Sequence, residues 1–169
     1  MDSETAPKPS AGFYGALAGF HAGVLGVLVL LAFAGLASAW YRRGFWGPEN
    51  VIASVFYGDD AVRAGFTFAT LSGLALYVIG YGLLGAAYGR LAYRSSNHLR
   101  VFLVAILAAL GWYYLWWGWL WEHVDPLVPL YTHDRPMFVG HVLYGMMLGR
   151  FPRYYERLTQ PPNPPAGRP

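Results

Sequence analysis

Residues 101–121 read VFLVAILAALGWYYLWWGWLW and are followed directly by Glu122-His123-Val124-Asp125-Pro126. The first half of this stretch is aliphatic and the second half is mostly aromatic, and so long an apolar run predicts a membrane-spanning helix. Trp and Tyr concentrate at the headgroup level of a bilayer, because their rings are apolar while their N–H and O–H groups hydrogen-bond. The stretch therefore predicts a helix with one end in lipid, an aromatic belt at the other end, and ionisable residues beyond the belt.

The composition of the whole chain agrees with a membrane environment. Its 169 residues are 56% hydrophobic and 12% charged, whereas an ordinary soluble domain is about 25% charged. The net charge of +3 is spread over the loops, which argues against a nucleic-acid partner. The chain contains no Cys, which excludes disulfides, thiolate catalysis and cysteine-ligated metal centres.

Four apolar segments predict an all-α, polytopic membrane protein whose single transmembrane domain covers residues 13–158. The four predicted transmembrane helices cover residues 13–40, 61–89, 100–122 and 136–151. The apolar part of the last one, residues 136–149, is about 21 Å long at helical rise, which is short for a ~30 Å hydrocarbon core.

The segments outside the spans are expected to be irregular, with one exception. Pro48 followed by Val51, Ile52, Val55 and Phe56 predicts a short amphipathic helix that lies flat at the membrane interface in the first outer loop. Residues 1–12 are polar and residues 159–169 are rich in proline, so both tails are predicted to be disordered.

Small residues recur four positions apart within three of the predicted spans. In a membrane such a stripe lets the backbone of a neighbouring helix approach closely. The glycines predicted to mediate helix packing are Gly15, Gly19 and Gly23 in the first span, Gly65 and Gly73 in the second, and Gly145 and Gly149 in the fourth.

The distribution of Lys and Arg predicts the orientation of the chain. One side of the membrane receives eight of them, namely Lys8, Arg90, Arg94, Arg100, Arg150, Arg153, Arg157 and Arg168. The other side receives four, namely Arg42, Arg43, Arg63 and Arg135. The positive-inside rule then places both termini in the cytoplasm and the Trp-rich belt outside, although Arg42 and Arg43 run against it.

The residues beyond the aromatic belt are candidate metal ligands: Glu122, His123, Asp125 and His133. A group of histidines and carboxylates of this kind could hold zinc or another divalent ion, or relay protons. Their spacing matches no specific ligand pattern, so the alternative is a set of hydrogen bonds and ion pairs that orients two outer loops.

His21 and His141 are candidate cofactor-binding residues, because an ionisable residue inside a span is a functional candidate. Either could be an axial ligand of haem or a pigment. Their predicted depths differ by roughly 10 Å in a ~30 Å core, which disfavours one shared haem. The alternative is a neutral histidine that donates to a carbonyl or a tyrosine of the next helix. The Trp-rich segment could likewise form a quinone or pigment pocket, or only an aromatic belt.

Residues 140–149 read GHVLYGMMLG. This segment resembles the G-H-x-x-Y-G-x-x-L-G closing span of several small, uncharacterised bacterial four-helix integral membrane proteins. The resemblance covers one helix and implies a bacterial inner membrane.

Three functions are open at this stage, and no motif for phosphate binding or nucleophilic catalysis indicates an enzyme. We expect a non-catalytic accessory subunit that packs against larger membrane proteins or its own copies, because the small-residue stripes exceed what a minimal bundle needs. One alternative is an electron-transfer subunit that binds haem, a pigment or a quinone. The other is an ion or solute pathway lined by the outer acids.

Overall fold

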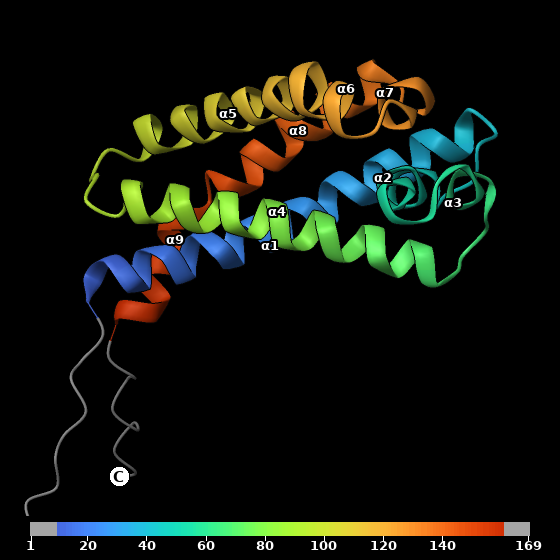
Figure 1. Ribbon diagram of the computed structural model, residues 1–169. Coiled ribbons are helices and arrows are strands. Elements are labelled where there is room, and N and C mark those ends of the chain that lie inside the picture. Colours follow the sequence, from blue (N-terminus) through green and yellow to red (C-terminus); the bar gives the residue numbers. More distant parts are fainter. Residues whose placement is uncertain (1–9, 161–169) are drawn as a thin grey trace, which may run out of the picture.

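The computed structural model describes residues 10–160, and within this range the chain is helical and contains no β-strand (Figure 1). The all-α prediction is therefore confirmed. The predicted disorder of the two tails falls almost entirely outside the described residues. In chain order the helices are α1 (Ala11–Trp40), α2 (Gly47–Tyr57), α3 (Asp59–Arg63), α4 (Phe68–Ala92), α5 (His98–Leu115), the π-helical turn η1 (Trp116–Leu120), α6 (Trp121–Val124), α7 (Leu127–Tyr131), α8 (Asp134–Leu148) and α9 (Phe151–Thr159).

Among the described residues, three helical stretches are long and apolar enough to cross a membrane: Ala11–Trp40, Phe68–Ala92 and His98–Val124. The third stretch is α5 continued through η1 and α6. The predicted fourth span corresponds to α8, which has 15 residues and is therefore only about 22 Å long. It is not one of the three.

The second long helix begins later than the predicted start at residue 61. Residues Asp59–Arg63 form the separate helix α3, and Ala64 and Thr67 are extended. A reciprocal capping box between Thr67 and Thr70 then starts α4. Each side chain bonds the backbone N–H of the other residue, which satisfies two donors that the first turn of a helix leaves free.

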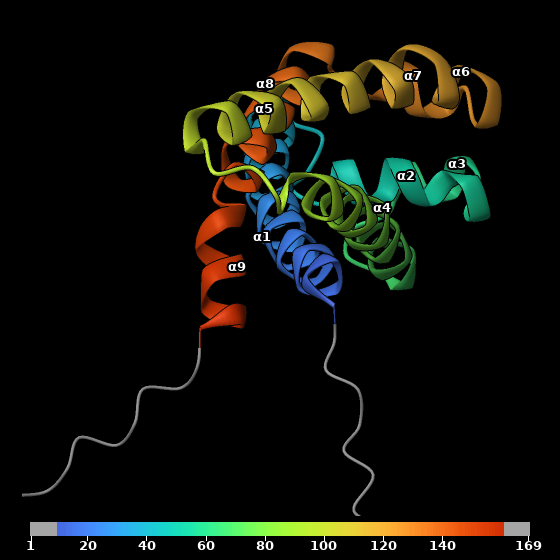
Figure 2. The same cartoon turned by 90° about the vertical axis from the view of Figure 1, so that its left-hand side faces the viewer.

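Helix α1 packs against both α4 and α8, and α5 packs against α8 (Figures 1 and 2). Glycines bring α1 and α4 close together. A Cβ atom added to Gly19 would lie 2.1 Å from the carbonyl oxygen of Gly85, and one added to Gly89 would lie 2.2 Å from that of Gly15. No larger residue fits there without separating the two backbones.

The other predicted packing glycines divide into two groups. A Cβ atom on Gly73 would lie 1.9 Å from the Glu49 carbonyl oxygen, one on Gly145 would lie 2.8 Å from Cα of Ile106, and one on Gly149 would lie 2.5 Å from the Phe102 ring. Gly65 differs, because it precedes α4 and a Cβ atom there would meet nothing within 4 Å. The helix expected to carry the Gly65 stripe does not extend that far.

Helix α2 forms after Pro48 as predicted, but its environment differs from the expectation. Its residues from Pro48 to Ser54 are all buried, while Val55 and Phe56 are exposed. The helix packs against α4, α1 and α7, at the end of the molecule where α1 finishes (Figure 1). Helix α2 therefore buries most of its residues within the protein, whereas the sequence predicted a helix that lies flat at the membrane interface.

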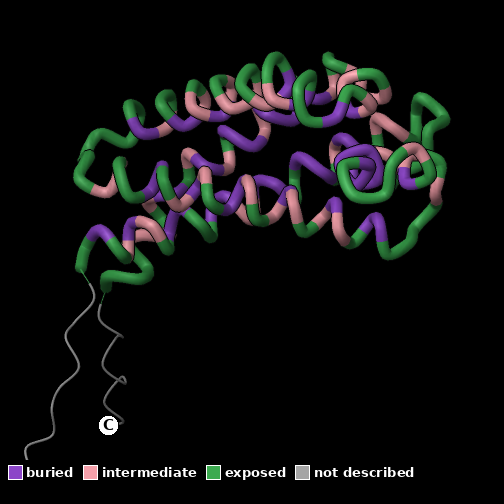
Figure 3. The backbone as a smooth tube through the Cα atoms, in the orientation of Figure 1, coloured by how far each residue is buried: buried purple, intermediate pink, exposed green. Residues whose placement is uncertain are grey.

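Helix α5 is the most exposed of the long helices. Only Val101, Ala105 and Ala109 of this helix are buried. Ala105 and Ala109 lie against Gly145 of α8, and Figure 3 shows the buried positions of α5 on its inner side. The opposite side carries large apolar residues such as Leu99, Leu103 and Leu107, which are more than half exposed. Such a surface is what a bilayer covers.

Candidate functional site

A cavity of about 230 Å³ lies between α2, α4 and the η1–α6 segment. We call it the aromatic cavity. It is lined by Ile52, Val55 and Phe56 of α2, by Leu76, Tyr77, Gly80 and Tyr81 of α4, and by Trp116, Trp117, Leu120, Trp121 and Val124 of η1 and α6. Gly80 helps to keep it open, since even an added Cβ atom would stay 3.8 Å from the Trp116 ring.

Two hydrogen-bond donors in the wall of the aromatic cavity have no acceptor among residues 10–160. They are the hydroxyl Oη of Tyr77 and the indole Nε1 of Trp117, which lies near the Tyr81 hydroxyl without forming a hydrogen bond of good geometry. Both side chains are buried, with 4% and 8% of their surface exposed. A buried donor that stays unpaired costs about 1–3 kcal/mol, and such groups are rare in native structures. Both donor atoms are covered by protein, so a ligand in the cavity would reach them only after these two side chains turn.

The π-helical turn η1 arranges the tryptophans of this wall. In η1 the N–H of Trp121 donates to the carbonyl of Trp116, five residues back. In a regular α-helix these two residues would point about 140° apart. The wider turn brings their rings to a centroid distance of 5.2 Å, and Trp112 lies 5.0 Å from Trp116 on the other side. Single π-helical turns of this kind occur frequently at functional sites.

His141 lies beside this cavity and is completely buried. Its Nδ1 is 2.7 Å from the Met137 carbonyl, which can only accept, so Nδ1 carries the proton and Nε2 is the acceptor. Tyr81 Oη donates to that Nε2 at 2.6 Å. Both ring nitrogens are thus used within the protein, and axial ligation of a haem would require the Tyr81 bond to break.

His21 has a different environment. It is exposed on α1, and its ring stacks on Tyr154 of α9 with the centroids 4.8 Å apart. His141 instead packs against Tyr81 of α4 and Tyr113 of α5. The structure does not bring the two histidines into one site.

The four candidate metal ligands are also not assembled. Asp125 accepts hydrogen bonds from Ser54 Oγ at 2.6 Å and from the Leu127 N–H at 3.0 Å, while His123 Nδ1 bonds the Trp119 carbonyl at 2.6 Å. Glu122 is exposed, and His133 packs on the Tyr41 ring. In the part of the chain that the structure describes, no group of three or more His, Asp and Glu side chains could hold a metal ion. The arrangement matches the alternative of loop-orienting hydrogen bonds, at least for Asp125.

The polar side of α2 is a feature that the sequence reasoning missed. Asn50 Nδ2 donates to the Ala64 and Gly65 carbonyls at 2.7 and 3.1 Å, and its Oδ1 accepts from Thr70 Oγ1 at 2.7 Å. One buried amide thus joins α2 to the start of α4. An amide in a short amphipathic helix is ordinarily expected on the solvent side, so only the tertiary packing reveals this role.

Glu49 is the second buried polar residue of α2. It is 3% exposed, and its Oε2 has no hydrogen-bond partner within the described range. Burial raises the pKa of this carboxyl from 4.5 to about 7, because the low-dielectric surroundings disfavour the charged form. Its backbone contacts Gly73, which is one turn before Tyr77 on α4.

Comparison of the chain with protein-family models, with curated proteins and with solved structures gives no match.

Proposed function

We propose that the protein is a membrane-embedded binding protein for a flat, apolar molecule with carbonyl oxygens, which is the chemistry of a quinone headgroup. The observation that supports this proposal is an apolar, aromatic cavity whose lining residues Tyr77 and Trp117 each hold a buried donor without an acceptor among the described residues, and these donors would turn toward a bound ligand. A carbonyl oxygen accepts from either donor and removes the cost of leaving it unpaired. Indole faces stack on a flat ring.

The size of the cavity and its lack of charge restrict the class of ligand further. Pockets that enclose a whole drug-sized ligand are about 300–1,000 Å³, and the aromatic cavity, at about 230 Å³, is smaller. It suits a ring, with any isoprenoid tail extending into the bilayer. Its lining contains no charged side chain, which disfavours an ionic ligand.

We further propose that α8 crosses the membrane as the fourth span, in a bacterial inner membrane, with both termini cytoplasmic. Helix α9 packs on α1 near the start of α1, so the first and last helices meet at one end of the bundle (Figure 1). Arg150, Arg153 and Arg157 follow α8 at that end. Their positive charges favour the cytoplasmic side, and snorkelling of Arg150 would accommodate the short span.

The accessory-subunit role and the ion pathway stay predictions. The small-residue stripes that suggested partner surfaces are largely used inside the chain, since Gly19 packs on Gly85 and Gly145 on Ile106. That argument for a partner no longer carries the accessory role by itself. The quinone-type ligand is compatible with the predicted electron-transfer subunit, whereas the predicted histidine ligation of haem competes with the Tyr81–His141 bond.

The test is a calorimetric titration of the full chain, held in nanodiscs, with a benzoquinone that carries one isoprene unit. We expect saturable binding that Tyr77→Phe weakens about tenfold, because one hydrogen bond of about 1–1.5 kcal/mol is lost. Gly80→Leu should abolish binding by filling the cavity. Tyr114→Phe is the control, since this tyrosine is 63% exposed. Absence of saturable binding, or undiminished binding to Gly80→Leu, would overturn the proposal.

A further inference from the structure

A second cavity, of about 300 Å³, lies where the end of α1 meets α2, α3, α7 and α8. We call it the arginine-lined cavity. Its lining includes Arg42, Arg43 and Arg63 together with the apolar residues Ala34, Ala37, Val51 and Met137. It shares no lining residue with the aromatic cavity, so an inference about it stands independently of the quinone-type ligand.

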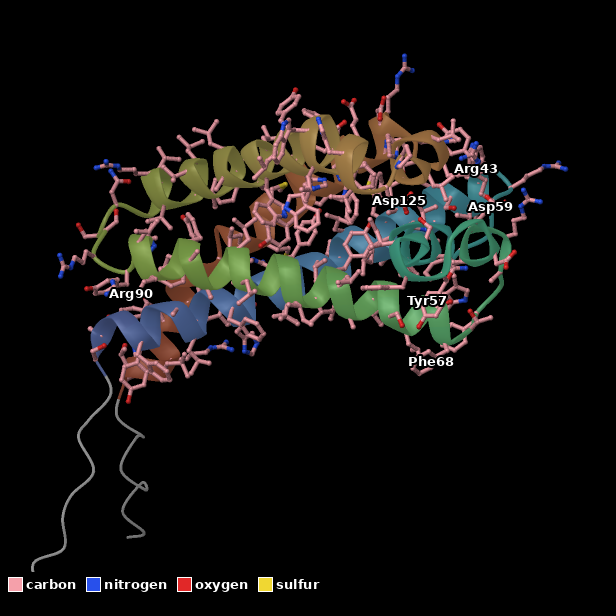
Figure 4. The ribbon with its side chains drawn as sticks, viewed as in Figure 1. Arg43, Tyr57, Asp59, Phe68, Arg90 and Asp125 are labelled. Atoms are coloured by element: carbon pink, nitrogen blue, oxygen red, sulfur yellow. The ribbon has the colours of Figure 1, made fainter. Side chains whose placement is uncertain are left out.

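The charged residues that line this cavity are all basic. Three arginines line it, and none of its lining residues is Asp or Glu. Arg43 Nη1 donates to the Tyr131 carbonyl at 2.6 Å, and Arg63 forms an ion pair with the exposed Asp59 at 2.6 Å. Figure 4 shows Arg43 and Asp59 at the same end of the molecule. These contacts hold two of the guanidinium groups in place while leaving further N–H donors on each.

Arg42 has the fewest side-chain polar contacts of the three arginines. Within residues 10–160 its side chain makes no hydrogen bond and no ion pair. Its backbone φ of 60° is left-handed and is the one positive φ of a described residue other than glycine. A residue with a Cβ atom pays about 1–2 kcal/mol for that conformation. Strain of this kind clusters at ligand-binding sites.

Two helix N-termini add to the positive potential. Gly47 and Pro48 begin α2, and His133 precedes α8, and all three residues line the cavity. Within residues 10–160 neither helix has a side-chain cap at its N-terminus, although each has one acidic residue in its first turn, Glu49 in α2 and Asp134 in α8, and neither of these lines the cavity. The first-turn N–H groups of a helix carry partial positive charge and bind phosphate and carboxylate groups.

The remaining part of the lining is apolar. Ala34, Val51 and Met137 are buried at the inner side of the cavity, where α1, α2 and α8 meet. A free inorganic anion gains nothing from such contacts, whereas an amphiphile buries hydrocarbon against them.

We propose that the arginine-lined cavity binds the phosphate group of an anionic amphiphile, with the phosphate among Arg42, Arg43 and Arg63 and the apolar portion against Ala34, Val51 and Met137. Arginine suits this role because its planar fork of donors matches the oxygens of a phosphate. The proposal also gives a reason for Arg42 and Arg43 to lie on the side of the chain that the positive-inside rule leaves poor in basic residues.

Native mass spectrometry of the purified full chain, in detergent containing phosphatidylcholine with added phosphatidylglycerol, tests the proposal. We expect one phosphatidylglycerol to stay bound in preference to phosphatidylcholine. Arg42→Gln should lower its retention about tenfold, since a charge-assisted contact is lost. Arg135→Gln is the matched control, because Arg135 is exposed near the same end of the chain but does not line the cavity.

Ala37→Leu provides a second variant, which fills the cavity without changing any charge and should also reduce retention. Inorganic phosphate, added as a competitor, distinguishes the two sources of the phosphate group. Displacement of phosphatidylglycerol by equimolar inorganic phosphate would overturn the amphiphile, because the apolar contacts would then contribute nothing. Equal retention of both lipids, or unchanged retention by Arg42→Gln and Ala37→Leu, would overturn the site itself. Circular dichroism confirms that each variant is folded.

Discussion

Tyr81 of α4 donates a 2.6 Å hydrogen bond to Nε2 of His141 of α8, although each of these two helices packs mainly against other helices, above all α1. A second contact runs between the same helices, where Tyr144 Oη donates to the Tyr81 carbonyl at 2.8 Å. The hydroxyls of two tyrosines therefore join α4 and α8 through the buried interior. In a low-dielectric interior each such bond is strong, and each lost partner is costly.

The first prediction concerns this link. Tyr81→Phe removes the donor and leaves Nε2 of the completely buried His141 without a partner, so we expect a loss of about 1–3 kcal/mol of stability. Thermal unfolding in detergent, followed by near-ultraviolet circular dichroism, measures it. Tyr114→Phe, which removes an exposed hydroxyl, should leave the melting temperature unchanged. An equal melting temperature for both variants would contradict the proposed link.

The second prediction concerns the contact between α1 and α4. Gly19→Ala places a methyl group 2.1 Å from the Gly85 carbonyl oxygen, and rigid backbone cannot yield as a flexible side chain does. We expect destabilisation of about 1–3 kcal/mol or more from overpacking. The same measurement on Gly111→Ala is the control, because that helical glycine has nothing within 4 Å of an added Cβ. Gly111→Ala should be neutral or stabilising by up to about 1 kcal/mol.

The third prediction is a pH dependence that arises from Glu49. Its pKa is raised from 4.5 to about 7 in the folded protein, so folding favours the protonated form. The contribution of Glu49 to the free energy of unfolding is fully present below about pH 4.5 and declines above that pH, because the carboxyl of the unfolded chain then ionises. The contribution amounts to about 3 kcal/mol and is lost by about pH 7. Melting temperatures measured across that window should fall with rising pH.

Glu49→Gln is the diagnostic variant for this pH dependence, because an amide does not titrate. Between pH 4.5 and 7 its melting temperature should change less with pH than that of the unmodified protein. Asp60→Asn, which changes an exposed carboxyl of α3, should retain the full slope. A slope that survives in Glu49→Gln would assign the pH dependence to another group.

The fourth prediction concerns Asp125. Its carboxylate accepts from Ser54 Oγ and the Leu127 N–H, so it fixes α2 to the segment after α6. Asp125→Ala should lower stability by about 1–3 kcal/mol, because the Leu127 N–H loses its acceptor and the Ser54 hydroxyl keeps only the Val51 carbonyl of its own helix, which breaks the link to α2. A chelator should leave the melting temperature unchanged. A fall on chelation would revive the metal site predicted from Glu122, His123, Asp125 and His133.

Local patterns predicted the parts of this fold that depend on local physics. The three long apolar helices follow from hydropathy, and the approach of Gly19 to Gly85 follows from small residues four positions apart. The start of α4 at Phe68 was missed, because hydropathy does not register the break between α3 and the Thr67 cap. The boundary depends on side-chain hydrogen bonds that a composition window averages out.

The candidate site was less accessible from the sequence. Tyr77 and Tyr81 are one turn apart on α4, and two hydroxyl-bearing side chains within a predicted span are a signal that the sequence reasoning did not use. The burial of Glu49 and Asn50 has no local signal, because it arises from packing of α2 between elements distant in the chain. The π-helical turn at Trp116–Leu120 likewise depends on what surrounds it.

That turn also sets the rotational phase of everything beyond it. A π-helical turn holds one more residue than an α-helical turn, so if residues 116–120 formed a regular α-helix, each later side chain would be turned by roughly 100° about the helix axis. Trp121 would then leave the row of indoles, and Asp125 would turn away from Ser54. Deleting Gly118 would instead let a regular helix keep both side chains in place, because the π-helical turn accommodates one extra residue.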